Sequence, residues 1–123
     1  MFNRVKPFES DFDWDRLHQL AERDTDFEIE LLQIFLEDLE QSLVQLTSAI
    51  ATWDADTLEQ VAHSVRGAAA NVGAVGLAQT AAQLEQIGQQ KQRNRAGTLL
   101  GQLQTQAQAV RQHLQRAKVI TTS

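Results

Sequence analysis

Three residues in one short segment have the types and the spacing that phosphoryl transfer needs: His63, Arg66 and Gly67, in the order His-Ser-Val-Arg-Gly. Successive side chains on a helix are about 100° apart, so His63 lies nearly opposite the apolar stripe and Gly67 follows it one turn later. A neutral imidazole nitrogen is a nucleophile, and a nearby guanidinium attracts an anion. The segment therefore predicts a histidine that receives a phosphoryl group on an exposed helix face.

Gly67 needs a specific reason to lie in a helix, because glycine there costs roughly 1 kcal/mol relative to alanine. On the outer face, no packing within the domain calls for a missing side chain. Ala70, two turns from His63, also has a small side chain on this face. We interpret Gly67 and Ala70 as small residues that leave room for a partner to approach the helix backbone beside His63.

Apolar residues recur every three to four positions along most of the chain, which is the pattern of amphipathic helices. Four long helices joined by short connections predict an all-α fold, an antiparallel up-and-down four-helix bundle with a short extra N-terminal helix. The expected helices run over about 13–21, 25–52, 54–72, 75–90 and 97–117.

The ends of these helices are predicted from capping residues. Asp13 and Asp54 suit the N-terminal caps of their helices, and Thr25 with Glu28 three residues later forms a capping-box pattern. Gly73 suits the left-handed backbone that often ends a helix, so the helix of His63 is expected to stop there.

The composition favours one helical domain. The 123 residues are 42% hydrophobic and contain one proline and no cysteine, which excludes disulfides and thiolate metal sites. We expect an N-terminal arm over 1–7, the bundle over 8–118 and a frayed tail over 119–123. The net charge of −5 argues against nucleic acid as a partner. Without a membrane-spanning run or a signal-peptide pattern, we expect a cytoplasmic protein that does not contact a membrane.

The segment around His63 resembles the signature of the histidine phosphotransfer (HPt) domain family, His-x-x-Lys-Gly followed by small residues and a further glycine. Arg66 occupies the usual lysine position. The positive charge is kept, but a planar guanidinium group replaces the ammonium group of a flexible lysine side chain. The resemblance extends over roughly 8–117. The segments that carry it are His63–Gly67, Ala68–Gly73, Leu77–Ala78, Phe12–Asp15 and Leu32–Leu39.

This resemblance implies a phosphocarrier. His63 would accept a phosphoryl group from the phospho-aspartate of a response-regulator receiver domain and pass it to another receiver in a multistep His-Asp phosphorelay. Arg66 would offset the negative charge, and Gly67 would let the partner's active site close over the histidine. A hybrid histidine kinase would supply the phosphoryl group upstream.

The same resemblance implies that the chain is not an enzyme. No Walker-type phosphate loop occurs in the sequence, so we expect no nucleotide binding and no autokinase activity. We expect no cofactor in this chain, with Mg²⁺ supplied by the receiver. We also expect a monomer.

Glu85 lies on the helix that packs beside the histidine helix in the family. Two interpretations stay open at this point. Its carboxylate could accept a hydrogen bond from Nδ1 of His63 and leave Nε2 as the nucleophile. Alternatively, it could form a simple ion pair with Arg66.

Phe27, Leu31 and Ile34 form a second apolar strip, on the far side of their helix from the core stripe. The short first helix could cover this strip through Trp14 and Leu17, or the strip could be an exposed patch on which a partner docks. We expect Phe27 and Leu31 to be partly covered and Ile34 to be more exposed. In the family, this helix and the histidine helix form the docking face.

Two other functions stay open: a helical protein–protein docking module without phosphotransfer, and the phosphoacceptor domain of a larger histidine kinase. His18 and His113 lie off the apolar stripes of their helices, and we expect both to be ordinary surface residues. Glu59, His63 and Glu85 could in principle meet at a metal ion. The Glu-x-x-His spacing of di-iron bundles is absent, so we expect no metal site.

Overall fold

The computed structural model describes residues 11–122, and every regular element in this range is a helix. The predicted arm over 1–7 lies outside the described residues. The helices are α2 (Trp14–Leu20), α3 (Thr25–Thr52), α4 (Ala55–Val72), α5 (Val75–Gln90) and α6 (Ala96–Thr122).

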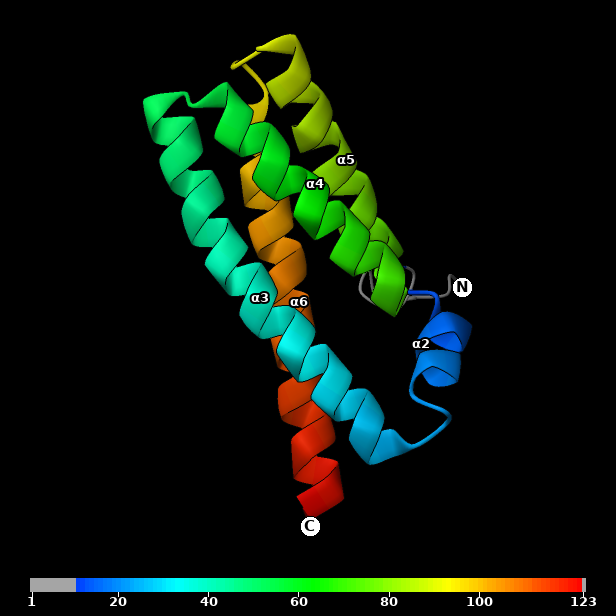
Figure 1. Ribbon diagram of the computed structural model, residues 1–123. Helices are drawn as coiled ribbons and strands as arrows, with labels where there is room; N and C mark the ends of the chain where they lie inside the picture. Colours follow the sequence, from blue (N-terminus) through cyan, green and yellow to red (C-terminus); the bar gives the residue numbers. More distant parts are fainter. Residues whose placement is uncertain (1–10, 123) are drawn as a thin grey trace, which may run out of the picture.

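The four long helices form the predicted antiparallel bundle. Successive helices from α3 to α6 run in opposite directions (Figure 1), and each packs on two neighbours: α3 and α5 both contact α4 and α6. Helices α3 and α6 are longer than α4 and α5 and extend past them at the end where α2 lies (Figure 1). The all-α, up-and-down fold is therefore confirmed.

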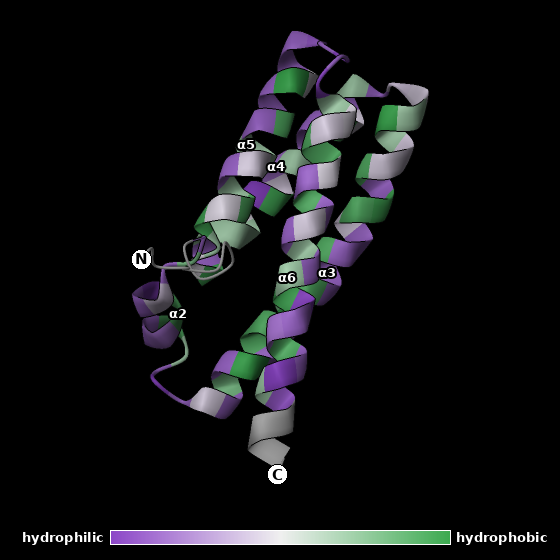
Figure 2. Ribbon diagram, turned by 180° about the vertical axis from the view of Figure 1, so that it is seen from behind, coloured by the Kyte–Doolittle hydropathy of each residue, from purple (hydrophilic) through white to green (hydrophobic). Residues whose placement is uncertain are grey.

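The core is built from the apolar stripes of the four long helices. Apolar and hydrophilic residues alternate along each of these helices (Figure 2), so each turns one side inward. Three apolar residues that pack against this core, Leu43, Ile50 and Val61, are only partly buried. The buried stripe residues are Leu32, Phe35, Leu36, Leu39 and Leu46 of α3, Leu58, Ala62, Val65, Ala69 and Val72 of α4, Leu77, Ala81, Leu84 and Ile87 of α5, and Leu99, Leu100, Leu103, Ala107, Val110 and Leu114 of α6.

Two of the predicted N-terminal caps are present. The Asp13 carboxylate accepts a hydrogen bond from the backbone amide of Arg16 at 3.1 Å. The Asp54 carboxylate accepts hydrogen bonds from the hydroxyl group and the backbone amide of Thr57, at 2.7 and 3.2 Å. These two bonds, the hydroxyl first, hold the pKa of Asp54 below its ordinary value because they stabilise the charged form.

The predicted capping box at the start of α3 is wrong. Asp24 is the cap, with its carboxylate 3.2 Å from the amide of Phe27, and Thr25 is already helical. The preceding turn is the reason: Glu22 and Arg23 have positive φ, so the chain arrives at Asp24 with the extended backbone that a cap requires. Glu28 is therefore free to bond elsewhere.

The end of α6 also differs from the prediction. The helix continues to Thr122, five residues beyond the expected end at Ala117. No proline or glycine follows Ala117 in the sequence, so nothing local stops the helix where its apolar stripe ends.

The turn between α4 and α5 joins the site helix to the N-terminal segment. Gly73 ends α4 with φ +84°, as predicted, and its carbonyl accepts a hydrogen bond from the Asp13 amide at 2.7 Å. Arg16 donates from Nε to the Asn71 carbonyl at 3.1 Å. Phe12 and Ala74 form an isolated antiparallel bridge beside this turn. The start of the described chain therefore closes one end of the site helix.

Replacing Gly73 by alanine should destabilise the domain. The left-handed backbone disfavours a side chain, and an added Cβ would lie 2.6 Å from the Asp13 carbonyl oxygen. We expect Gly73→Ala to lower the free energy of unfolding by about 2 kcal/mol, measured by urea denaturation. Gly101→Ala is the matched control, because a Cβ there meets nothing within 4 Å and should stabilise α6 slightly. Equal stability of the Gly73 variant and the parent would contradict this account.

Candidate functional site

His63 lies in the middle of α4 and points away from the core. Its neighbours Ala62 and Val65 are buried on the inner side, whereas the His63 side chain is 64% exposed. Burial of the apolar stripe thus fixes the outward direction of the imidazole, as the sequence predicted.

The imidazole contacts two charged side chains. Its Nδ1 lies 2.9 Å from Oε2 of Glu85 and 3.0 Å from Nη2 of Arg66. Arg66 Nε lies 2.8 Å from Oε1 of Glu85. The structure therefore contains the contact that each open interpretation of Glu85 required: the carboxylate reaches His63, and it also forms an ion pair with Arg66.

Glu85 is the most enclosed member of this cluster. Its side chain is 13% exposed, against 44% for Arg66 and 64% for His63. It comes from α5, beside the fully buried Leu84, so the packing of α5 on α4 places the carboxylate. A carboxylate in this position is screened less by solvent than an ion pair on the open surface.

The two contacts at Nδ1 of His63 require opposite tautomers. A protonated Nδ1 donates to Glu85 and leaves the lone pair of Nε2 available. An unprotonated Nδ1 accepts from Arg66, because a guanidinium has only donors, and the proton is then on Nε2. No described residue forms a hydrogen bond with Nε2 in either case. The ring therefore presents its Nε2 edge outward.

Gly67 and Ala70 lie on the same exposed face of α4. A Cβ added to Gly67 would meet nothing within 4 Å among the described residues, so no packing in this part of the chain requires glycine there. Gly76 is different, since a Cβ there would lie 2.4 Å from the side chain of Asp11. The space beside His63 is thus open, as the sequence argument required.

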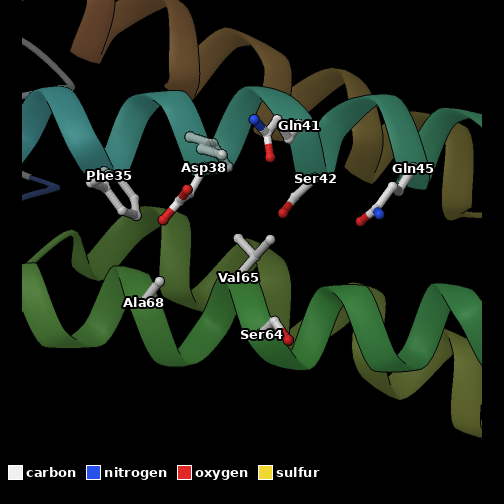
Figure 3. A pocket seen from close by; sticks show the side chains of 9 residues that line it. Phe35, Asp38, Gln41, Ser42, Gln45, Ser64, Val65 and Ala68 are labelled. Atoms are coloured by element: carbon white, nitrogen blue, oxygen red, sulfur yellow. The ribbon is translucent and has the colours of Figure 1, made fainter.

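A groove with a volume of about 280 Å³ lies between α3 and α4. Figure 3 shows Phe35, Asp38 and Ser42 projecting from α3 toward α4, with Val65 projecting from α4 toward α3. Ser64, the residue after His63, also lines it. This groove was not predicted from the sequence; the available signal was the pair of small residues, Ser64 and Ala68, on the side of α4 that faces α3.

The apolar strip on α3 is open to solvent to the extent expected. Phe27 is 41% exposed and Ile34 is 57% exposed, and Leu31 is half-buried. The Leu17 side chain of α2 is fully buried, so it does not extend the exposed strip. Ile34 precedes the groove residue Asp38 by one turn, so the strip leads into the α3–α4 groove.

The other two histidines are not the ordinary surface residues that the sequence suggested. Both are half-buried. His18 Nδ1 lies 2.7 Å from Oε2 of Glu28, and the His113 ring lies 5.3 Å from the Trp14 ring. The reason is that the Trp14 ring of α2 packs against both histidines, stacked on His18 and tilted against His113. Neither has an open glycine one turn later.

The described range contains neither a candidate metal site nor a candidate membrane-spanning helix. Within residues 11–122, no group of three or more His, Cys, Asp or Glu side chains could hold a metal ion. Over the same residues, no helix combines the length and the apolar character needed to cross a membrane.

The comparisons with known proteins agree with this geometry. The Hpt domain family model matches residues 30–113, a range that contains His63, Arg66, Gly67 and Glu85. The crystal structure of histidine-containing phosphotransfer protein B (HptB) from Pseudomonas aeruginosa PAO1 is similar, with a TM-score of 0.81 and 31% identity over 91% of this chain and 95% of that chain. No curated protein matches the chain. The chain therefore belongs to the Hpt domain family and is a phosphotransfer protein of a His-Asp phosphorelay.

Proposed function

We propose that His63 carries the phosphoryl group, on Nε2. The observation that carries this proposal is the hydrogen bonding of the ring: Nδ1 lies against Glu85 and Arg66, Nε2 has no hydrogen-bond partner among the described residues, and the helix surface at Gly67, one turn later, is open. As a phosphotransfer intermediate rather than a kinase, the protein would take the group from the phospho-aspartate of one receiver domain and give it to another.

The transfer is an in-line displacement at phosphorus. The lone pair of His63 Nε2 forms the N–P bond, the bond between phosphorus and the aspartate oxygen of the receiver breaks, and its electron pair leaves with the receiver carboxylate. The proton stays on Nδ1, where Glu85 accepts its hydrogen bond. In this proposal the receiver supplies Mg²⁺, and the chain itself holds no cofactor.

The receiver would dock across α3 and α4. The strip of Phe27, Leu31 and Ile34 leads into the α3–α4 groove, and Gly67 and Ala70 leave the backbone beside His63 uncovered. In this scheme a hybrid histidine kinase supplies the phosphoryl group, and the domain acts as a cytoplasmic monomer that meets one receiver at a time.

Phosphotransfer should require His63 and neither of the other histidines. His63→Gln should keep the fold, because the side chain is mostly exposed and contributes little packing. Incubation with a ³²P-labelled receiver domain should then give no label on the variant. His18→Gln and His113→Gln should still accept label, and the phosphate should be acid-labile and base-stable. Label retained by His63→Gln would disprove the assignment, and no label on the parent would favour a docking module.

Arg66 should support transfer by balancing the charge of Glu85. Arg66→Ala leaves that carboxylate unpaired beside the ring, so the incoming phosphoryl group meets a net negative site. We expect slower transfer or a shorter phosphohistidine lifetime, by about 1–3 kcal/mol in free energy, without unfolding. Arg66→Lys should recover most of the loss. Transfer at the parental rate in Arg66→Ala would reduce Arg66 to a solvated helix residue.

Substitutions of Gly67 should affect the stability of the domain and the rate of phosphotransfer in different ways. Gly67→Ala should raise the free energy of unfolding by about 0.5–1 kcal/mol and reduce transfer only modestly. Gly67→Gln should keep the thermal midpoint but slow transfer at least about a hundredfold, because its side chain fills the space needed for in-line approach.

Gly101→Gln on α6 is the matched control for Gly67→Gln. A Cβ at Gly101 also meets nothing within 4 Å, and α6 does not pack against the helix of His63. It should transfer normally. A lowered midpoint with normal transfer in Gly67→Gln would instead identify Gly67 as a packing glycine.

A further inference from the structure

Arg66 has two possible anionic partners once His63 is phosphorylated: Glu85 and the phosphoryl group. In the structure Glu85 holds it, with Arg66 Nε 2.8 Å from Oε1. Arg66 Nη2 lies 3.0 Å from Nδ1 of His63 and 3.5 Å from Oε2 of Glu85. The guanidinium therefore lies beside Nδ1, whereas the phosphoryl group would be attached at Nε2, across the ring.

Glu85 is suited to keep Arg66 in this place. Its carboxylate is 13% exposed and is carried by α5, so it is positioned by the packing of a second helix. Arg66 is 44% exposed and has a long side chain, so it is the mobile member of the pair. Moving the guanidinium toward Nε2 would break the ion pair and leave the largely enclosed carboxylate with the Nδ1–H group of His63 alone, which is less favourable.

Given the proposed acceptance of phosphoryl groups by His63, we propose that Glu85 is a positioning residue that holds Arg66 on the Nδ1 side of the ring and thereby lowers the affinity of His63 for the phosphoryl group. The bonds made and broken are those of the displacement described above. In this role Glu85 changes the free energy of phosphorylated His63 relative to the phosphorylated receiver. A carrier that binds its cargo weakly releases it readily to the next receiver.

The test is the equilibrium partition of ³²P between the domain and a receiver domain, in the presence of Mg²⁺. Glu85→Gln keeps the shape of the side chain and removes its charge, which frees Arg66 to bind the phosphoryl oxygens. We expect the ratio of label on His63 to label on the receiver to rise about five-fold. In the Arg66→Ala background, Glu85→Gln should raise the ratio less, because only a through-space charge is removed.

Glu59→Gln is the matched control. Glu59 precedes His63 by one turn and lines the same shallow depression as Glu85, and no hydrogen bond or ion pair joins it to Arg66. The substitution removes the same unit of charge on the same face. We expect it to change the ratio by less than about two-fold, because Glu59 forms no ion pair with Arg66 that the substitution could release.

A measurement on the parent protein avoids any dependence on variants. The domain is phosphorylated with phosphoramidate, a small-molecule donor that requires no receiver, and the ¹⁵N signal of Arg66 Nε–H is followed by NMR. We expect the signal to keep its position and slow exchange, because the guanidinium stays on Glu85. A large displacement of the signal would show that Arg66 moves to the phosphoryl group, and would overturn the inference.

The remaining outcomes also test the role of Glu85 and the proposed function. An unchanged or lower ratio in Glu85→Gln, or a rise as large in the Arg66→Ala background, would overturn the role of Glu85 while leaving His63 as the carrier. No label on the parent protein from either donor would overturn the proposed function, and this inference with it. The two failures are therefore distinguishable.

Discussion

The whole arrangement depends on one constraint: α4 must bury one side against α3 and α5 and leave the other side bare. Its inner residues, such as Leu58 and Ala69, are fully buried, and the helical repeat of 3.6 residues then forces His63 outward. The site is therefore a by-product of core packing. Any change that rotates α4 about its axis would turn the imidazole away from its neighbours on α5.

The second requirement is a fixed register between α4 and α5. Glu85 reaches His63 only because the short turn at Gly73 sets how far α5 runs back along α4. Gly88 contributes to the same register further along, since a Cβ there would lie 3.0 Å from the carbonyl oxygen of Ala55. Close contact of the two helix backbones thus brings a carboxylate to a ring 22 positions away in sequence.

Local patterns in the sequence predicted most of the fold and the centre of the site. The apolar stripes, the caps at Asp13 and Asp54 and the end of α4 at Gly73 all depend on residues close in sequence, and the structure has them. The N-terminal cap of α3 was assigned to Thr25 instead of Asp24 because the unusual turn before Asp24 has no distinctive residue type. The joint contact of Glu85 with His63 and Arg66, like the α3–α4 groove, depends on how separate helices pair, which local spacing does not specify.

The anchoring of the N-terminal segment has a consequence for how the domain can be divided. The family model begins at residue 30, yet the residues that close the α4–α5 turn lie before it. Asp11 accepts a hydrogen bond from the Gly76 amide at 3.0 Å, and the 7% exposed Phe12 ring completes the core at this end. A fragment cut at the family boundary would lose that cover and open the end of the site helix to water. The smallest unit that keeps the site intact is thus larger than the stretch by which the family is recognised.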